Sequence, residues 1–556
     1  MRKLTAWVAL AASALTITGC SDGSAQHGGG SGTGNQDSKS PTSAASSAAP
    51  TPRWAAVKGP PRTIPAVRGF KAADGTGWRV SKNARVVVPA GQDSPLADEA
   101  RRLAADLGGL KLSWKDDARP GDVELTLSGK GKGKAAGENN AAPASTADEA
   151  YTLTARDTRL TLSAPTDTGI FNATRTVVQS VRASGGVPEG TIQDRPDRAQ
   201  RGLLVDTARK HFSADWLEKR VREMADLKLN QLQLHFSDDQ AFRIESSSHP
   251  EIVSSDHLTK AQVRHLVKLA RELHITVIPE IDSPGHLGAV IDKHPELQLR
   301  SAAGTSQRGA IDISQPKAAR IVDDLLREYA ELFAEEGVPG PRWHLGGDEY
   351  RALTVKSPGA TYPQLARAAT KKYGANATVQ DLTTGWLNDR EKTLRKAGVQ
   401  HVEAWNDGFH DSKVVTPDRD RTVAYWTGKE IGAREPVTYL KEGRTVVNLN
   451  DEYLYYVLGQ PNDFTYPTGE RIYKEWTPAV VRGSKAVPAS LAGPDRIPGA
   501  RFGVWCDLAQ SQTTDQVARG IRLPLAALSQ KVWDPRKPSL SWTDFKARAA
   551  TVAPAR

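Results

Sequence analysis

At positions 342–350 the sequence runs Arg342-Trp343-His344-Leu345-Gly346-Gly347-Asp348-Glu349-Tyr350. Apolar positions, two glycines and two adjacent carboxylates are typical of a buried strand whose end opens into a cleft. Neighbouring side chains on a regular strand face opposite ways. Asp348 and Glu349 can therefore share one site only where the strand breaks, which Gly346-Gly347 permits. Crowded carboxylates take different ionisation states, so that one holds a proton and the other stays charged. A lone Asp-Glu pair is more often a solvated turn, so the site depends on its neighbours.

From Arg201 onward, strand and helix periodicities alternate, as in proteins with a parallel sheet. The predicted strands are 202–206, 231–236, 275–282, the strand before Asp348, 400–405, 422–426, 445–449 and 501–505. Helical patterns are clear up to about Ala397 and weaker after Trp426, and 450–500 has the composition of a Pro/Gly-rich loop. The predicted fold is therefore α/β, with a (β/α)8 TIM barrel over residues 196–545.

A small α+β domain is predicted before the barrel, over residues 61–195. Its expected strands are 85–89, 123–127, 151–154 and 160–162, and its expected helices are 96–107 and 169–184. A Gly/Lys/Ala/Asn stretch at 129–147 is predicted to be a surface loop. We find no chemical constellation in this domain and expect it to give structural support.

Residues 1–20 have the pattern of an export signal, with Arg2 and Lys3 followed by a short apolar run. The ending Ile17-Thr18-Gly19-Cys20 resembles a bacterial lipobox, in which the cysteine is lipidated; an ordinary signal peptide is the alternative. Residues 21–60 are predicted to be a disordered Ser/Gly/Ala/Pro tether. We expect a lipoprotein held through Cys20 at the extracellular face of the cell membrane, or a secreted protein. Only Cys506 would then remain, which excludes an intramolecular disulfide.

The composition is that of a globular protein, with 38% hydrophobic and 25% charged residues and a net charge of +10. No dense Lys/Arg block or nucleic-acid motif is present, so a nucleic-acid partner is not expected. The 13 tryptophans are notable because clefts that bind sugar rings use aromatic walls.

In a TIM barrel the active site lies at the carboxyl ends of the strands. Chemically active residues gather at or just beyond the predicted strand ends, namely Asp206, Asp238, Asp239, Asp282, His286, Asp348, Glu349, Trp405, Trp426 and Asp507. Scattered surface acids would have no reason to cluster in this way, so the pattern indicates an enzyme site.

With these residues in place, the chain resembles glycoside hydrolase family 20, the β-N-acetylhexosaminidases and their relatives. The resemblance spans about residues 65–540. Its segments are Arg201-Gly202 through Asp206 and Arg209, His235-Phe236-Ser237-Asp238-Asp239-Gln240, Pro279-Glu280-Ile281-Asp282-Ser283-Pro284-Gly285-His286 and His344-Leu345-Gly346-Gly347-Asp348-Glu349.

The resemblance implies substrate-assisted catalysis, in which the 2-acetamido group of the sugar is the nucleophile. Glu349 would be the general acid and later the base, and Asp348 would orient the acetamido group. His286 with Asp238 would tune Glu349. The implied sugar contacts are Tyr453 to the acetamido carbonyl, Trp405, Trp426 and Trp505 as walls, and Arg201 to the hydroxyls of the terminal sugar. The expected substrate is a glycan with terminal β-linked N-acetylhexosamine.

Two positions depart from the pattern of many family members. Tyr455 and Asp507 stand where an Asp and a Glu usually contact sugar hydroxyls. These forms look closer to the lacto-N-biosidase and biofilm-dispersing branches, so release of a disaccharide is the alternative activity. A non-catalytic glycan-binding lipoprotein is the alternative from another class.

Other barrel hydrolases fit less well. A family 18 enzyme would carry Asp-x-x-Asp-x-Asp-x-Glu, which is absent from the sequence. The histidines lack metal-ligand spacing on any one element, so no metal is predicted. The mechanism implied by the resemblance needs no cofactor.

Overall fold

The computed structural model describes residues 55–128, 145–334, 341–430 and 433–553, which belong to one compact unit. The predicted export signal, Cys20 and most of the predicted tether lie outside these residues, as does most of the predicted loop at 129–147. Among the described residues, no helix combines the length and apolarity needed to cross a bilayer.

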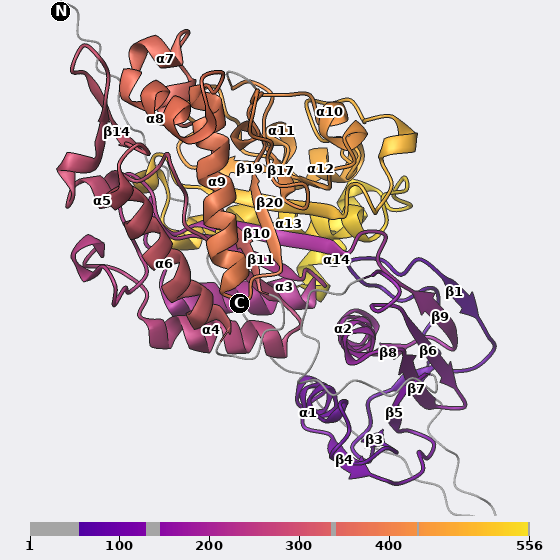
Figure 1. Cartoon of the computed structure of the whole chain (residues 1–556). Coiled ribbons are helices and arrows are strands. Elements are labelled where there is room, and N and C mark those ends of the chain that lie inside the picture. The colour runs from indigo at the N-terminus through magenta and orange to yellow at the C-terminus, as the bar shows by residue number, and fades with distance from the viewer. Residues whose placement is uncertain (1–54, 129–144, 335–340, 431–432, 554–556) are drawn as a thin grey trace, which may run out of the picture. The chain divides into compact units, whose positions relative to one another are not determined.

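The first domain is a seven-stranded mixed sheet with two helices packed against it (Figure 1). The strand order is β1 (Phe70–Ala72), β9 (Gly190–Asp194), β6 (Tyr151–Arg156), β7 (Arg159–Ala164), β5 (Val123–Leu127), β3 (Arg85–Val88) and β4 (Lys111–Trp114). The helices are α1 (Ala97–Asp106) and α2 (Asp167–Ser184), and a two-stranded ladder joins β2 (Trp78–Arg79) to β8 (Gly186–Val187). Every predicted element is present. The short strands β1, β2, β4, β8 and β9 were not predicted.

The second domain is a closed parallel barrel, which confirms the predicted fold. Its strands are β10 (Gln200–Asp206), β11 (Gln231–His235), β12 (Thr276–Glu280), β15 (Arg342–His344), β16 (His401–Trp405), β17 (Thr422–Tyr425), β18 (Val446–Asn448) and β20 (Gly499–Trp505). Parallel pairing of β10 with β20 closes the ring. The 450–500 segment is more ordered than its composition predicted, because it contains α11 (Asp451–Leu454), β19 (Tyr455–Val457) and α12 (Gly469–Glu475).

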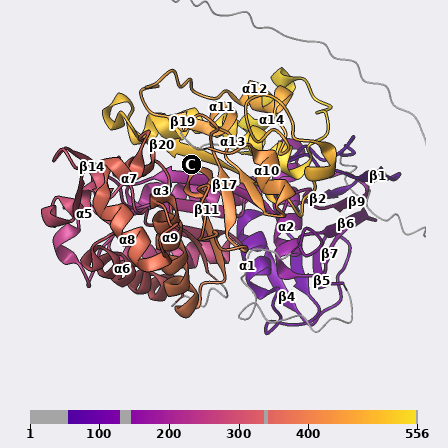
Figure 2. The ribbon, with the colours of Figure 1, turned by 45° about the horizontal axis from the view of Figure 1, so that its top comes forward.

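The long helices outside the strands are α3 (Ala214–Asp226), α4 (Lys260–Glu272), α6 (Pro316–Ala334), α9 (Val379–Lys396) and α13 (Thr514–Trp533). The starts of α3, α4, α9 and α13 are fixed by side-chain caps; for example, Thr259 and Gln262 form a capping box at α4. In Figure 2, α6 and α9 lie side by side. Shorter elements are α5 (Gly288–Ile291), β13 (Gln298–Arg300), β14 (Ser306–Ile311), α7 (Pro358–Thr361), α8 (Pro363–Tyr373), α10 (Pro436–Lys441) and α14 (Trp542–Val552).

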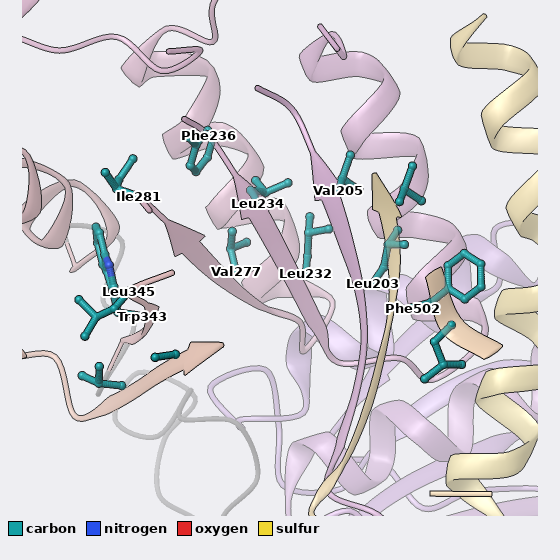
Figure 3. Close-up of a cluster of buried hydrophobic side chains, with 14 of the residues drawn as sticks. Leu203, Val205, Leu232, Leu234, Phe236, Val277, Ile281, Trp343, Leu345 and Phe502 are labelled. Carbon is teal, nitrogen blue, oxygen red and sulfur yellow. The ribbon is translucent and has the colours of Figure 1, made fainter. Parts of the chain in front are cut away.

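Alternation along the barrel strands produces two separate cores. Leu203 and Val205 belong to the large core that includes the helices, whereas Leu204 between them packs inside the ring with Trp405 and Trp505. Figure 3 shows part of the large core, with side chains from β10, β11, β12 and β20. Because successive strand residues point to opposite faces, a residue's place in this alternation decides whether it faces the helices or the barrel interior.

Candidate active site

A pocket of about 460 Å³ contains most of the residues singled out in the sequence. Of the predicted set, its lining includes His286, Asp348, Glu349, Trp426, Trp505 and Asp507. These six residues lie at or after the carboxyl ends of β12, β15, β17 and β20. Barrel enzymes have their active sites at this end of the strands.

The backbone after β15 breaks at the two glycines, as the sequence predicted. Gly346 and Gly347 have φ angles of 70° and 96°, and Glu349 has the unusual value of 49° for a residue with a side chain. The N–H of Gly347 donates to Asp282 Oδ1 (2.8 Å), and the N–H of Glu349 donates to Asp407 Oδ2 (2.9 Å). These two carboxylates hold the turn that brings Asp348 and Glu349 into one pocket.

Asp348 and Asp282 are neighbouring carboxylates, with an oxygen of one within 4.8 Å of an oxygen of the other. Asp282 Oδ2 and Asp348 Oδ1 are buried and have no hydrogen-bond partner within the described chain. Burial, and then the charge of Asp348, raises the pKa of Asp282 well above its ordinary value, and burial raises the pKa of Asp348 less strongly. Two such neighbours cannot both ionise. We therefore place one proton on Asp282, which leaves Asp348 negatively charged toward the pocket.

Glu349 contacts a histidine that is itself held by a carboxylate. His286 Nε2 lies 3.3 Å from Glu349 Oε2, and His286 Nδ1 lies 3.2 Å from Asp238 Oδ1. Burial opposes the charged form of His286, but Asp238 and Asp348 outweigh it and raise the pKa of His286 well above its ordinary value. Burial likewise raises the pKa of Glu349, yet the hydrogen bond and charge of His286 hold it below its ordinary value. In the open pocket Glu349 is thus ionised beside an imidazolium.

Asp238 is buried behind His286 and does not line the pocket. It also pairs with Arg209 (2.7 Å) and His235 (3.0 Å). Glu280 on the other side of His235 raises the pKa of this buried imidazole to about 10, despite the opposing effect of burial. Asp238 is therefore a junction between Arg209, His235 and His286, which fits the expected tuning of Glu349.

Aromatic rings form one side of the pocket. Trp426 and Tyr455 stack with ring centroids 5.7 Å apart, and Tyr455 lies 5.8 Å from Trp505. The indole N–H of Trp426 donates to Asp407 Oδ1 (3.0 Å), so Asp407 positions both this ring and the backbone of Glu349. Trp405 does not line the pocket: it is fully buried, donates to Glu280 Oε1 (2.9 Å) and packs 5.8 Å from Trp505. Trp405 therefore supports Trp505 from the barrel interior. This corrects the expectation that Trp405 forms a wall of the pocket.

Arg201 lies away from the pocket, which corrects the expectation that it contacts sugar hydroxyls. It sits near the start of β10, is 1% exposed, and forms a buried ion pair with Glu149 of the first domain. Amino ends of barrel strands lie at the opposite end of the barrel from the active site. Arg209 does line the pocket; it follows the carboxyl end of the same strand and pairs with Asp206 (3.0 Å).

Tyr453 is also outside the pocket. It lies in α11, where its hydroxyl donates to Glu475 (3.3 Å) and its ring packs under Arg471. Tyr455, two residues later at the start of β19, occupies the pocket instead. The sequence contained both tyrosines, and only the turn between them decides which one faces the cleft.

A parallel barrel with carboxyl groups gathered at its carboxyl-terminal end is an architecture used by glycoside hydrolases. The family model "Glycosyl hydrolase family 20, catalytic domain" matches residues 199–535, and "Glycosyl hydrolase family 20, domain 2" matches residues 60–195. The chain belongs to glycosyl hydrolase family 20.

Individual relatives share this architecture. A β-N-acetylhexosaminidase of Cellulomonas fimi is 33% identical over 493 residues, which cover 81% of this chain and 86% of the relative. A lacto-N-biosidase of Bifidobacterium bifidum is 30% identical over 496 residues, which cover 88% of this chain but only 41% of the relative. The match to the N,N'-diacetylchitobiase of Vibrio harveyi covers 44% of that relative, so the chain spans less than half the length of these two. The solved family 20 β-N-acetylhexosaminidase of Streptomyces coelicolor superposes with a TM-score of 0.67 at 22% identity, over 89% of this chain and 95% of that one.

Proposed function

We propose that this glycoside hydrolase releases terminal β-linked N-acetylhexosamine with retention of configuration, using the 2-acetamido group of the substrate as nucleophile. The observation that carries the proposal is the pair Asp348 and Glu349 at one pocket, facing the stacked rings of Trp426 and Tyr455. Solved structures with the same fold, from Streptomyces plicatus and Vibrio harveyi, hold N-acetylglucosamine (GlcNAc), which supports this substrate class.

In the proposed first step Glu349 protonates the glycosidic oxygen while the acetamido carbonyl oxygen attacks the anomeric carbon, and the bond to the leaving alcohol breaks. Asp348, kept anionic by the proton on Asp282, accepts the acetamido N–H and stabilises the positive charge that develops there. Tyr455, which lines the same pocket, donates its hydroxyl to the acetamido oxygen in this proposal. Water, deprotonated by Glu349, then opens the cyclic intermediate, and the nucleophile has high effective molarity because it belongs to the substrate.

Glu349 must hold a proton for this step, although His286 lowers its pKa in the open pocket. Its side chain is 43% exposed there. A sugar bound over it would exclude water and so favour the neutral acid. We therefore expect the pKa of Glu349 to rise when substrate binds.

The test compares chromogenic β-glycosides of N-acetylglucosamine and of lacto-N-biose with wild type and Glu349→Gln. Wild type should release the monosaccharide, and Glu349→Gln should lose about 10²- to 10⁴-fold of that activity. Glu470→Gln, at an exposed pair with Lys474, is the matched control and should retain it. Full activity in Glu349→Gln would contradict the proposed role.

Disaccharide release is the second candidate, favoured by further residues in the pocket lining and by one relative. Beyond the catalytic pair, the lining continues to Lys429, Phe464 and Arg471, and the chain is 30% identical to a lacto-N-biosidase. Release from the lacto-N-biose glycoside alone would select this activity. If neither glycoside is cleaved but both bind, the glycan-binding alternative replaces the enzyme. Lipid anchoring through Cys20 stays a separate prediction, testable by mass spectrometry of the membrane fraction.

A further inference from the structure

Two copies of a short motif stand in neighbouring loops of the barrel. His249-Pro250-Glu251-Ile252 lies in the loop after β11, and His294-Pro295-Glu296-Leu297 lies in the loop after β12. Each histidine directly precedes a 3-10 turn that starts at the proline, and their backbone angles nearly coincide, with φ/ψ of −137°/63° and −129°/62°. The repeated backbone holds the two imidazoles in similar positions on their loops.

The two imidazoles converge on one carboxylate oxygen. Glu251 Oε1 lies 3.1 Å from His249 Nδ1 and 3.0 Å from His294 Nε2. The three side-chain atoms lie within 4.8 Å of one another. The histidine side chains are only 15% and 16% exposed, so both rings are held in place.

We propose that His249, Glu251 and His294 form a binding site for a divalent transition-metal ion of the zinc class. Zinc binds imidazole nitrogen and carboxylate oxygen at about 2.0–2.2 Å in tetrahedral geometry. Tetrahedral angles at these bond lengths put ligand atoms roughly 3.4 Å apart. The two separations from Glu251 Oε1, 3.1 and 3.0 Å, require those ligands to open by only a few tenths of an ångström, and the fourth position is left for water.

The other ring nitrogens face carboxylates, which is the usual support for metal-binding histidines. His249 Nε2 lies 3.5 Å from Asp324 Oδ2 and has no hydrogen-bond partner, and His294 Nδ1 lies 3.8 Å from Glu296 Oε1. Lys317 also approaches His294 Nδ1, at 3.4 Å, and can donate to it. Donation by Lys317 requires the ring proton on Nε2, facing Glu251, whereas metal binding at Nε2 requires it on Nδ1, facing Glu296.

The charges around the cluster favour a cation. Glu251, Glu296 and Asp324 supply three carboxylates, against Lys317, which pairs with Glu296, and Arg327, which pairs with Asp324 (2.6 Å). With neutral imidazoles the cluster is therefore net negative. A His₂–carboxylate set suits zinc, copper or nickel better than calcium or magnesium, which take oxygen ligands. Because the ligands come from two loops, no spacing along the sequence could reveal them.

The site would join the loops after β11 and β12, which also contain Asp238 and His286. A hydrogen bond from the Gly288 N–H to Asp239 Oδ1 (3.0 Å) already links the same loops. The proposed ion lies in these loops and takes no part in the catalytic steps above. Its effect would be to stabilise the arrangement that places His286 against Glu349.

The test is calorimetric titration of the full, chelator-treated chain with Zn²⁺. Wild type should bind one more ion than His249→Gln and one more than His294→Gln. His265→Gln, which removes a mostly exposed histidine 3.5 Å from Glu218 on other elements, should bind as wild type does. Asp324→Asn should weaken binding by about tenfold if it supports His249.

A spectroscopic measurement on the wild-type chain avoids reliance on the fold of any variant. Co²⁺ at this site should give the intense visible bands of a tetrahedral complex, displaced by stoichiometric Zn²⁺. Absence of those bands, or Zn²⁺ binding of equal stoichiometry in wild type and both histidine variants, would overturn the proposal. The cluster would then be a hydrogen-bonded link between the two loops, in which both imidazoles donate to Glu251.

Discussion

At the scale of single residues, the pocket depends on side chains that never touch the cleft. Asp407 accepts the backbone N–H of Glu349 with one oxygen and the indole N–H of Trp426 with the other. Glu349 has a left-handed φ of 49°, which costs free energy for a residue with a side chain. The hydrogen bond to Asp407 is the contact that opposes this cost.

Asp407→Ala should therefore damage both catalysis and the aromatic wall. It removes the acceptor of the exposed Glu349 N–H and of the partly buried indole N–H of Trp426, at a cost of about 0.5–1.5 kcal/mol for each hydrogen bond. We expect kcat to fall because Glu349 is no longer held, and KM to rise because Trp426 shifts. Steady-state kinetics on the cleaved glycoside measure both. Unchanged constants in a folded variant would remove Asp407 from the positioning residues.

The buried imidazolium of His235 predicts a pH dependence of stability. Its folded-state pKa is about 10 against an ordinary 6.5. Between these values the folded state holds a proton that the unfolded state lacks. The stabilisation is complete below pH 6.5 and falls as pH rises toward 10, by at most about 1.4 kcal/mol per pH unit.

Urea denaturation of wild type and His235→Gln across that window checks the sign. The free energy of unfolding should decrease more steeply with pH in wild type than in the variant. Other groups titrate in both proteins and cancel in the difference. Equal slopes would mean that His235 carries no extra proton between Asp238 and Glu280.

Residue roles could be predicted from the sequence only where a motif fixes the local geometry. The Gly-Gly-Asp-Glu run correctly predicted a strand break and a shared site, because the backbone leaves few alternatives. Arg201 and Arg209 both flank the first strand, and strand polarity alone could have identified Arg209 as the one at the active end. Tyr453 and Tyr455 are separated by the end of a one-turn helix, which no periodicity reveals.

At the scale of elements, the end of β15 is tightly constrained by its neighbours. A Cβ at Gly346 would lie 1.8 Å from Asp282 Oδ1, whereas one at Gly347 would lie 3.1 Å from the flexible end of Leu387. Both glycines have positive φ. They differ in what they leave room for: the first makes space for the carboxyl pair, and the second only for an aliphatic side chain.

Gly346→Ala should consequently be the more damaging of two matched substitutions. Both pay the φ penalty of about 1 kcal/mol, but Gly346→Ala also displaces Asp282 from Asp348. We expect Gly346→Ala to lose activity and stability together, and Gly347→Ala to lose mainly stability. Denaturation midpoints and turnover of the two proteins decide this, and a milder Gly346→Ala would contradict the packing.

The strands themselves were predictable because each barrel strand is a short apolar run bounded by turn residues. All eight were identified, with bounds within a few residues of those observed. What the pattern missed was β19, whose Tyr455-Tyr456-Val457 pairs with β20 inside a segment rich in proline and glycine. Its order comes from pairing with a distant strand, so local composition carries no signal of it.

At the scale of the whole molecule, a buried polar seam joins the two domains within the described unit. Arg201 pairs with Glu149, and its guanidinium lies over Trp533 of the last long barrel helix. The indole N–H of Trp533 in turn donates to Asp194 of the first domain (3.1 Å). Removing one member of a buried ion pair leaves the other charge uncompensated, typically at 3–5 kcal/mol.

Arg201→Met and Arg209→Met should then have opposite signatures. Arg201→Met should lower the free energy of unfolding by about 3–5 kcal/mol while the folded fraction keeps its kcat and KM. Arg209→Met should change kinetics, because Arg209 lines the pocket and pairs with Asp238. Thermal denaturation and steady-state kinetics together distinguish the two variants. An altered KM in folded Arg201→Met would show that Arg201 contacts the substrate after all.

The closure of the ring by β10 and β20 also has a consequence for biosynthesis. These partners are separated by most of the barrel sequence, from Asp206 to Gly499. At a typical 5–20 residues per second, the roughly 300 residues between them take on the order of 15–60 s to be made. Throughout that interval one edge of β10 has no strand to pair with, while the strands on its other side emerge one after another from the ribosome. The nascent barrel therefore passes through a long stage in which an unpaired strand edge can pair with other chains. Only the last barrel strand ends that stage.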